Sequence, residues 1–259
     1  MKNIVILVFY LFLSGCLIGQ IESLNFISKH RSEIESHDPS DYLLDSIQNQ
    51  ISIEIGHKNS IKNLSHSVFG YLPYWQYPDA LEHLQYDLLS HIALFDFGVN
   101  TDGSIDYPPQ WPWSDLITTA HQNGVKLILT AVNFNGSEIH TILTNESTKS
   151  AFFSNILLAL QQYNLDGVNI DFEGVNSSDR GDVLINFMAE LSSFLHNTNS
   201  TYEISFASPP INWGGWDFEG LANSCDYLFI MGYNFYGPWS NTSGPCSHYQ
   251  EVHIILQML

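Results

Sequence analysis

The clearest local pattern in the chain is the stretch Leu165-Asp-Gly-Val-Asn-Ile-Asp-Phe-Glu-Gly174. Its middle alternates polar and apolar residues with period two, which is typical of a β-strand. Asn169, Asp171 and Glu173 therefore share one face of the strand. Because neighbours two apart lie about 6.6 Å from one another, ionised carboxylates there disfavour each other, and at least one pKa is expected to rise. A carboxylic acid that stays protonated near neutral pH can act as a general acid.

The alternative is an ordinary half-buried strand with a charged face. That interpretation explains the alternation, but it does not explain why two acids and an amide crowd one face directly before a glycine. Acidic residues are poor strand formers, so the placement works against local propensity. Such departures are expected at functional sites, and we interpret this face as one.

Residues 166–173 resemble the Asp-Gly-x-Asp-x-Asp-x-Glu signature of glycoside hydrolase family 18, the chitinase-like enzymes. The match fails only at Asn169, where the family usually has Asp. Residues 226–234, Asp-Tyr-Leu-Phe-Ile-Met-Gly-Tyr-Asn, are similar to a later family strand that ends in Met-x-Tyr-Asp or Met-x-Tyr-Asn. The resemblance runs from about Val68 to about Pro245.

From residue 68 onward, apolar runs of strand length alternate with helix-like stretches, which indicates βα units and a parallel sheet. Strands are expected at 68–72, 89–99, 125–132, 165–174, 202–207 and 227–233, and helices at 114–123, 147–163 and 179–196. A doubly wound sheet is the alternative to a (β/α)₈ barrel. No G-x-G-x-x-G turn or P-loop is present, and candidate catalytic groups end several strands, as in a barrel. The resemblance implies the same TIM barrel.

The barrel is expected to be incomplete, because we find about six of the eight βα units that closure requires. The expected organisation is a signal peptide or lipoprotein signal at 1–20, a polar spacer at 21–67, a partial family-18 barrel at 68–245 and an atypical tail at 246–259. The abrupt loss of family character suggests a frameshift or truncated gene. The exposed edges would then make the chain aggregation-prone and inactive alone.

The resemblance implies a retaining, substrate-assisted mechanism without a metal or organic cofactor, unlike the usual two-carboxylate scheme. Glu173 would protonate the glycosidic oxygen and later activate water. Asp171 would orient the substrate's acetamido group, Tyr233 would hydrogen-bond that group, and Asn234 would line the same subsite. Asn169 cannot share a proton as an Asp would, but it could donate a hydrogen bond to Asp171. Asp166, at the strand's start, is assigned a structural role.

All six tryptophans fall in segments that we expect to be loops after strands: Trp75, Trp111, Trp113, Trp213, Trp216 and Trp239. Indole faces stack on sugar rings, so the distribution suits a glycan cleft, with Trp75 and Trp239 as substrate-binding candidates. Alternatively, several merely cap the barrel rim. The histidines before residue 67 show no metal-ligand spacing and are expected to be solvated, while His91 is expected to be a satisfied core histidine.

The chain has 259 residues, with 8 basic and 27 acidic side chains and a formal charge of −19. That charge disfavours nucleic acid or an anionic membrane as a partner. Lys2 and the apolar run from Ile4 to Leu13 predict export, to the extracellular space or to the bacterial envelope through a lipid on Cys16, because Leu13-Ser-Gly-Cys16 resembles a lipoprotein box. Cys225 and Cys246 could pair, but no disulfide is expected to be required.

The sequence therefore predicts an exported enzyme that cleaves β-1,4-linked N-acetylglucosamine polymers, chitin or a related glycan. A peptidoglycan or glycoprotein N-acetylglucosaminidase of the same family is the second interpretation. A catalytically silent carbohydrate-binding protein or an inactive truncated fragment is the third. The presence of Glu173 argues against a silent protein. No G-x-S-x-G elbow and no H-E-x-x-H motif support other hydrolases.

Overall fold

The computed structural model describes residues 29–42, 64, 66–212, 214–233, 236 and 241–244. Within this part of the chain, parallel strands form one curled sheet in the order β1-β2-β4-β5-β6-β7. A short β3 pairs antiparallel with β2. The strands are β1 (Phe69–Pro73), β2 (His91–Val99), β3 (Ile105–Asp106), β4 (Lys126–Asn133), β5 (Gly167–Phe172), β6 (Glu203–Ser208) and β7 (Tyr227–Ile230).

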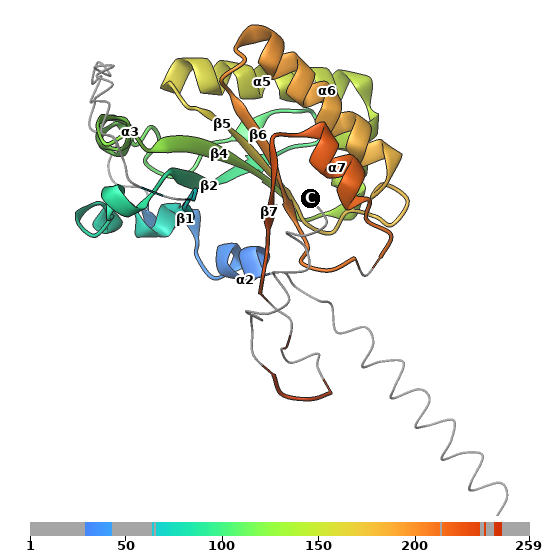
Figure 1. Ribbon diagram of the computed structural model, residues 1–259, viewed down its shortest axis with the longest axis horizontal. Coiled ribbons are helices and arrows are strands. Elements are labelled where there is room, and N and C mark those ends of the chain that lie inside the picture. The colour runs from blue at the N-terminus through green and yellow to red at the C-terminus, as the bar shows by residue number, and fades with distance from the viewer. Residues whose placement is uncertain are drawn as a thin grey trace, which may run out of the picture.

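Helices follow most of the parallel strands, and α5 and α6 lie along one face of the sheet (Figure 1). The α-helices are α2 (Lys29–Glu35), α3 (Ser114–Gln122), α4 (Gly136–Thr144), α5 (Glu146–Tyr163), α6 (Asp182–Thr198) and α7 (Phe218–Ser224). Short 3-10 helices are η1 (Pro39–Tyr42), η2 (Tyr74–Gln76), η3 (Asp79–Glu82) and η4 (Tyr86–Leu88). Among the described helices, none is both long and apolar enough to cross a membrane.

The predicted α/β class and the six parallel strands are confirmed within one or two residues at most ends, and they form a curled, open part of a barrel. The sequence interpretation missed β3, α2, α4 and α7. The N-cap of α4 is Asn135, whose side chain accepts from the backbone N–H groups of Ser137 and Glu138. Gly136 and Ser137 directly after this cap are typical of a loop, which hid the helix.

The core lies between the sheet and its outer helices. On the outward face of β5, Val168, Ile170 and Phe172 are buried, and Phe172 packs near Phe152 of α5 and Phe187 of α6. The backbones of β5 and β6 lie close together at Gly167. A side chain at Gly167 would overlap the carbonyl oxygen of Glu203, so only glycine fits there.

The inner face of the sheet is lined by aromatic side chains that meet across the curl. Phe229 of β7 lies 5.2 Å from Phe69 and 4.9 Å from Tyr71 of β1, between ring centroids. The first and last described strands of the sheet therefore touch through their side chains without pairing their backbones. This curl brings the carboxyl ends of the strands together around one site.

The amino ends of the strands carry a charged cluster. His91 Nε2 lies 2.9 Å from Glu203 Oε2, and Lys126 forms an ion pair with the other Glu203 oxygen. Burial opposes ionisation of Glu203, but the hydrogen bonds from His91 and Lys126 outweigh it and lower the pKa of Glu203 to about 2. His91 also contacts Ser90 at 2.7 Å. The expectation of a satisfied core histidine is confirmed.

Cys225, half-buried after α7, donates through its thiol to the carbonyl oxygen of Leu221 at 3.1 Å. Burial raises the pKa of Cys225 to about 12. Cys16 and Cys246, the other two cysteines, lie outside the described residues.

Candidate active site

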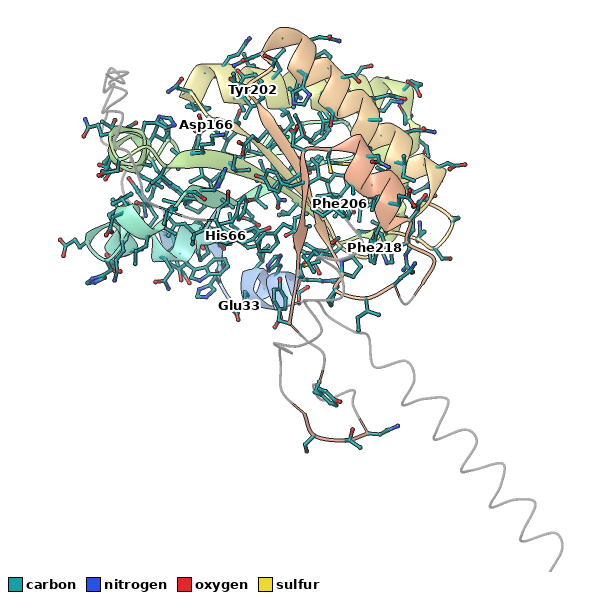
Figure 2. The ribbon with its side chains drawn as sticks, in the orientation of Figure 1. Glu33, His66, Asp166, Tyr202, Phe206 and Phe218 are labelled. Carbon is teal, nitrogen blue, oxygen red and sulfur yellow. The ribbon has the colours of Figure 1, made fainter. Side chains whose placement is uncertain are left out.

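The candidate site lies where β5 ends. Asn169 and Asp171 have no exposed side-chain surface, and Glu173 follows immediately after the strand. Asp166, at the opposite end of β5, accepts hydrogen bonds from the Leu127 N–H and from His121 at 2.7 and 2.8 Å. Its predicted structural role agrees with these bonds. Figure 2 shows Asp166 at one end of the sheet and Glu33 of α2 at the other.

His30 of α2 reaches both acids. Its Nδ1 lies 2.6 Å from Asp171 Oδ2 and 3.2 Å from Glu173 Oε1, and its Nε2 lies 2.7 Å from the Tyr233 hydroxyl. The sequence interpretation placed His30 in a polar spacer and expected a solvated side chain. That expectation is wrong, because 14% of this side chain is exposed and it bridges the two predicted catalytic acids.

His30 carries a positive charge in this setting. Burial alone would lower the pKa of an imidazole, but the Asp171 carboxylate, with help from Glu173, outweighs burial and raises the pKa of His30 to about 10. The site therefore holds an imidazolium beside Asp171 and Glu173 at neutral pH. A charged hydrogen bond of 2.6 Å is at the short, strong end of the range.

The same three side chains present ligand atoms within 4.8 Å of one another, a set that could hold a metal ion. Two ligands of one zinc ion, bound at 2.0–2.1 Å in tetrahedral geometry, lie about 3.3 Å apart. The 2.6 Å between His30 Nδ1 and Asp171 Oδ2 is shorter than that. A shared proton therefore fits this contact and a zinc ion does not.

Asn169 is held by neighbours other than Asp171. Its Oδ1 accepts from the Tyr71 hydroxyl and its Nδ2 donates to Ser205 Oγ, both at 2.8 Å. The expected hydrogen bond from Asn169 to Asp171 does not form between these two described residues. Asp171 bonds instead to His30 through Oδ2, while its buried Oδ1 makes no hydrogen bond with any described residue.

Aromatic rings surround the His30 imidazole. The ring centroids of Tyr71 and Phe95 each lie 5.2 Å from that of His30, and the centroid of Tyr233 lies 5.8 Å away. Together with the two acids, these rings form a box around the His30 imidazole. Tyr233 was predicted from the sequence. Tyr71 and Phe95 were missed, although both stand at carboxyl-terminal parts of predicted strands.

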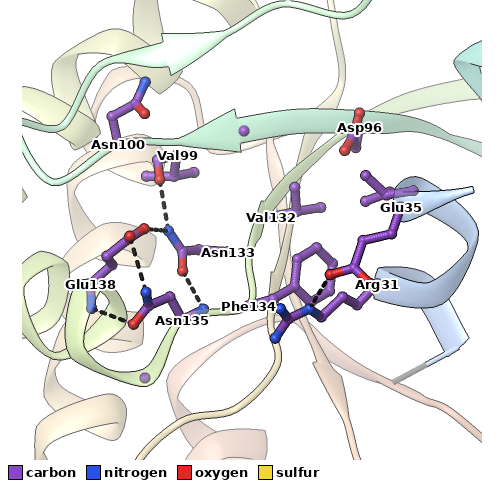
Figure 3. A pocket seen from close by; sticks show the side chains of 13 residues that line it. Arg31, Glu35, Asp96, Val99, Asn100, Val132, Asn133, Phe134, Asn135 and Glu138 are labelled. Atoms are coloured by element: carbon purple, nitrogen blue, oxygen red, sulfur yellow. Dashed lines mark hydrogen bonds and ion pairs between the residues drawn. The ribbon is translucent and has the colours of Figure 1, made fainter. Parts of the chain in front are cut away.

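A cavity of about 590 Å³ opens beside the box (Figure 3). Its walls include Arg31 and Glu35 of α2, which form an ion pair at 2.7 Å, and Asp96 of β2. Burial, with a contribution from the Asp171 charge, raises the pKa of Asp96 to about 6. Opposite, Asn133 donates to Glu138 at 3.0 Å. The cavity thus has a mixed lining, in which Glu35, Asp96 and Glu138 stand among apolar side chains, and it reaches the end of β4.

The described tryptophans differ in how far their rings are buried. Trp75, in η2 directly after β1, is half-buried, and its ring stacks on His37 with 4.3 Å between centroids and 8° between planes. Trp113 is fully buried against Tyr77, and Trp216 is nearly buried under Arg180. For Trp113 and Trp216 the glycan-cleft interpretation is wrong, because a loop position did not mean an exposed ring. Trp213, Trp239 and Asn234 lie outside the described residues.

Residues 67–254 match the family Glycosyl hydrolases family 18. This chain belongs to that family. Asp171 of β5 and Glu173 directly after it lie within the matched range, which covers every described strand.

This family-18 chain is similar in sequence to curated relatives and in fold to solved structures. A Bacillus subtilis (strain 168) protein designated a sporulation-specific glycosylase, YdhD, is 27% identical over 217 residues, covering 78% of this chain and 50% of its own length. The human protein di-N-acetylchitobiase is 28% identical over 127 residues, covering 47% of this chain and 32% of its own. The crystal structure of a chitinase from Bacteroides thetaiotaomicron superposes with a TM-score of 0.61 at 20% identity, over 71% of this chain and 59% of that one. This chain spans half or less of these curated relatives' lengths.

Proposed function

We propose that this family-18 chain is a glycoside hydrolase that cleaves β-1,4-linked N-acetylglucosamine glycans, chitin or a chitin-like polymer, by substrate-assisted retaining catalysis. The observation that carries the proposal is the state of Asp171. Its side chain is completely buried, one carboxylate oxygen is engaged, and Oδ1 has no partner among the described residues. A buried acceptor without a donor is costly, and the N–H of an acetamido group would satisfy it.

In this mechanism, the Glu173 carboxyl gives its proton to the glycosidic oxygen while the bond from that oxygen to the anomeric carbon breaks. The acetamido carbonyl oxygen of the same sugar forms the new bond to that carbon, giving an oxazolinium ion. Asp171 accepts a hydrogen bond from the acetamido N–H and balances its positive charge. Tyr233 hydrogen-bonds the same group. Glu173, now a carboxylate, takes a proton from the water that opens the ring, so configuration is retained.

The box and the cavity support these roles. The box between Tyr71, Phe95 and Tyr233 offers ring faces and edges for one sugar with its acetamido group. The cavity beside it, with Asp96 and Asn133 on its walls, offers hydrogen-bonding partners for a neighbouring sugar. Trp75 presents a ring at the edge of the same site, where it would stack on a sugar. Asn234 and Trp239 stay proposed substrate contacts.

A second candidate is an N-acetylglucosaminidase acting on peptidoglycan, with the same residues in the same roles. Similarity to the designated sporulation-specific glycosylase favours it. The loops around the cavity, and not β5, would decide between the two polymers. A silent carbohydrate-binding protein is disfavoured because both acids are present and close together.

The test is hydrolysis of tetra-N-acetylchitotetraose, of peptidoglycan glycan strands and of the fully deacetylated chitotetraose, with the product anomer followed by proton NMR. Because His30 contacts both acids, the assay includes the wild-type chain and the His30→Ala variant. We expect cleavage of an acetylated substrate with the β-anomer formed first, and no cleavage of the deacetylated one. Equal cleavage of acetylated and deacetylated tetramers would refute participation of the acetamido group.

We also propose that the chain is exported, on the basis of Lys2 and the apolar run up to Leu13. These residues and Cys16 lie outside the described part of the chain. Radiolabelled palmitate would enter the wild-type protein and not a Cys16→Ala variant if Cys16 is the lipid anchor. Release of an unlabelled, shortened wild-type protein into the medium would instead indicate simple cleavage and secretion.

A further inference from the structure

Residues 29–42, here called the N-terminal segment, run across the site that the proposed function assigns to the substrate. α2 stands apart from the outer helices and lies near the lower end of β7 in Figure 1. The segment includes α2 and η1 and precedes the family-18 match, which begins at residue 67. The segment therefore lies outside the range that matches the family, and it packs against the barrel as an additional element.

Two histidines of this segment occupy two positions that the proposed function gives to sugars. His30 fills the box at Asp171, Glu173 and Tyr233. His37, seven residues later, covers the face of Trp75 at 4.3 Å in a nearly parallel stack. An imidazolium is planar and positively charged, as is the oxazolinium ring of the proposed intermediate. It satisfies the two acids as that intermediate would.

Contacts other than those of the His30 and His37 imidazoles also hold the segment against the barrel. The Tyr74 hydroxyl donates to the His37 carbonyl oxygen at 3.0 Å, and Gln110 Nε2 donates to the Tyr42 carbonyl oxygen at 2.7 Å. Tyr42 also meets Tyr74 edge to face at 5.5 Å. Arg31 and Glu35 form one wall of the cavity next to the box. Contacts from β1, β2, β5 and the loops after them thus hold the segment in one place.

We propose that the N-terminal segment is an internal competitor of the glycan: docked, it occupies the acetamido subsite through His30 and the Trp75 stacking surface through His37, and it must leave before a sugar can bind. The inference rests on the proposed function. It adds a second, self-inhibited state of the same site. A long glycan that also fills the cavity would displace the segment better than a short one, because it gains contacts that the segment does not block.

An internal competitor reduces the fraction of molecules that can bind substrate, and the apparent KM rises by the inverse of that fraction while kcat is unchanged. A segment docked nine-tenths of the time would raise KM about 10-fold. In the full chain, His30→Ala should therefore lower KM for tetra-N-acetylchitotetraose about 10-fold or more at unchanged kcat. His37→Ala should give a smaller decrease. The matched control is His83→Ala, an exposed histidine at the end of η3, which should change neither constant.

A second measurement does not depend on turnover. Hydrogen exchange of the α2 amides in the wild-type chain should speed up when tri-N-acetylchitotriose is added, because the sugar frees the helix. An unchanged KM in His30→Ala, or α2 exchange that stays slow under saturating sugar, would overturn the inference and leave the proposed function standing. A fall in kcat would make His30 part of the catalytic machinery and also overturn it. If no variant binds or cleaves any of the glycans, the proposed function fails and the inference fails with it.

Discussion

Tyr71 of β1 and Asn169 of β5 are joined across the inside of the sheet by a hydrogen bond of 2.8 Å, from the tyrosine hydroxyl to the amide oxygen. The amide nitrogen of Asn169 in turn donates a hydrogen bond of 2.8 Å to the hydroxyl oxygen of Ser205 in β6. Three strands are thus linked directly beneath Asp171. At the position where the family usually has an acid, the amide serves as a neutral connector, with an acceptor for tyrosine and a donor for serine.

Asn169→Asp is expected to replace this connector with a buried acid next to Asp171. The shape is kept, and the Ser205 hydroxyl can turn to donate, but a second charge is disfavoured there. We expect a loss of about 1–3 kcal/mol in the free energy of unfolding at pH 8, smaller at pH 5, and a pH–rate profile whose acid limb belongs to the pair. The control is Asn197→Asp on the exposed face of α6. An unchanged profile would contradict proton sharing.

Glu173→Gln is expected to reduce kcat by about 10²–10⁴-fold, since an amide can neither give nor retake the proton. Binding of tri-N-acetylchitotriose should remain, because the side chain keeps its size. Both kcat and the dissociation constant for tri-N-acetylchitotriose should be measured in a His30→Ala background. In that background, loss of the His30 contact to Glu173 cannot alter docking of the N-terminal segment. Glu190→Gln, half-exposed on α6, is the control. Equal kcat in the two glutamine variants would refute the assignment.

Docking of His30 is expected to weaken at alkaline pH. The pKa of His30 is raised from 6.5 to about 10, so the contribution of its charge to docking is complete below pH 6.5 and is lost as the pH rises through about 10. Of the groups that face the ring, Asp171 and Glu173 act on it as carboxylates, Tyr233 shares Nε2, and Tyr71 stays neutral, because burial raises its pKa well above 10.

The measurement is the NMR titration of the His30 Cε1–H resonance between pH 5 and 11. A midpoint near 10 is expected in the wild-type chain, and a lower one in Asp171→Asn, which keeps the shape of the side chain and removes its charge. A wild-type midpoint near the ordinary histidine value would show that the imidazole does not lie between the two acids.

Glu203→Gln is expected to destabilise the amino-terminal end of the sheet by about 1–3 kcal/mol, because His91 and Lys126 lose a shared charged partner. The pKa of Glu203 is lowered to about 2, so its contribution is present above pH 4.5 and is lost as the pH falls through about 2. Urea unfolding of the wild-type chain and the variant at pH 7 and pH 3 measures this. Glu146→Gln, on an exposed side chain of α5, should stay within about 0.5 kcal/mol. A variant as stable as wild type at pH 7 would contradict the role of the cluster.

The main strands were predictable because each carries a continuous signal. β5 alternates with period two, and the other parallel strands are apolar runs bounded by polar segments. β3 has only two residues, and α7 has seven, so neither is long enough for periodicity to appear. Trp113 is buried although it lies between elements, since its neighbours Tyr77 and Trp111 enclose it. Burial of that kind depends on contacts distant in sequence.

For the site, the sequence predicted Asp171, Glu173 and Tyr233, which lie around one box, but not His30. The sequence around His30 is a polar spacer without a sustained apolar stripe, and a histidine in such a stretch is usually solvated. Its partner Asp171 is 141 residues away, and no spacing rule links the two. The raised pKa and the contact with Glu173 follow only from that three-dimensional meeting.

The position of the N-terminal segment before residue 67 affects how this protein should be produced for study. A recombinant fragment cut at the family boundary would keep β1 to β7, Asp171 and Glu173, yet it would lack His30 and His37 altogether. Kinetic constants from such a fragment would describe an open enzyme. Inhibitor screens against it would favour compounds that the natural chain, with its own imidazolium in place, binds far less well.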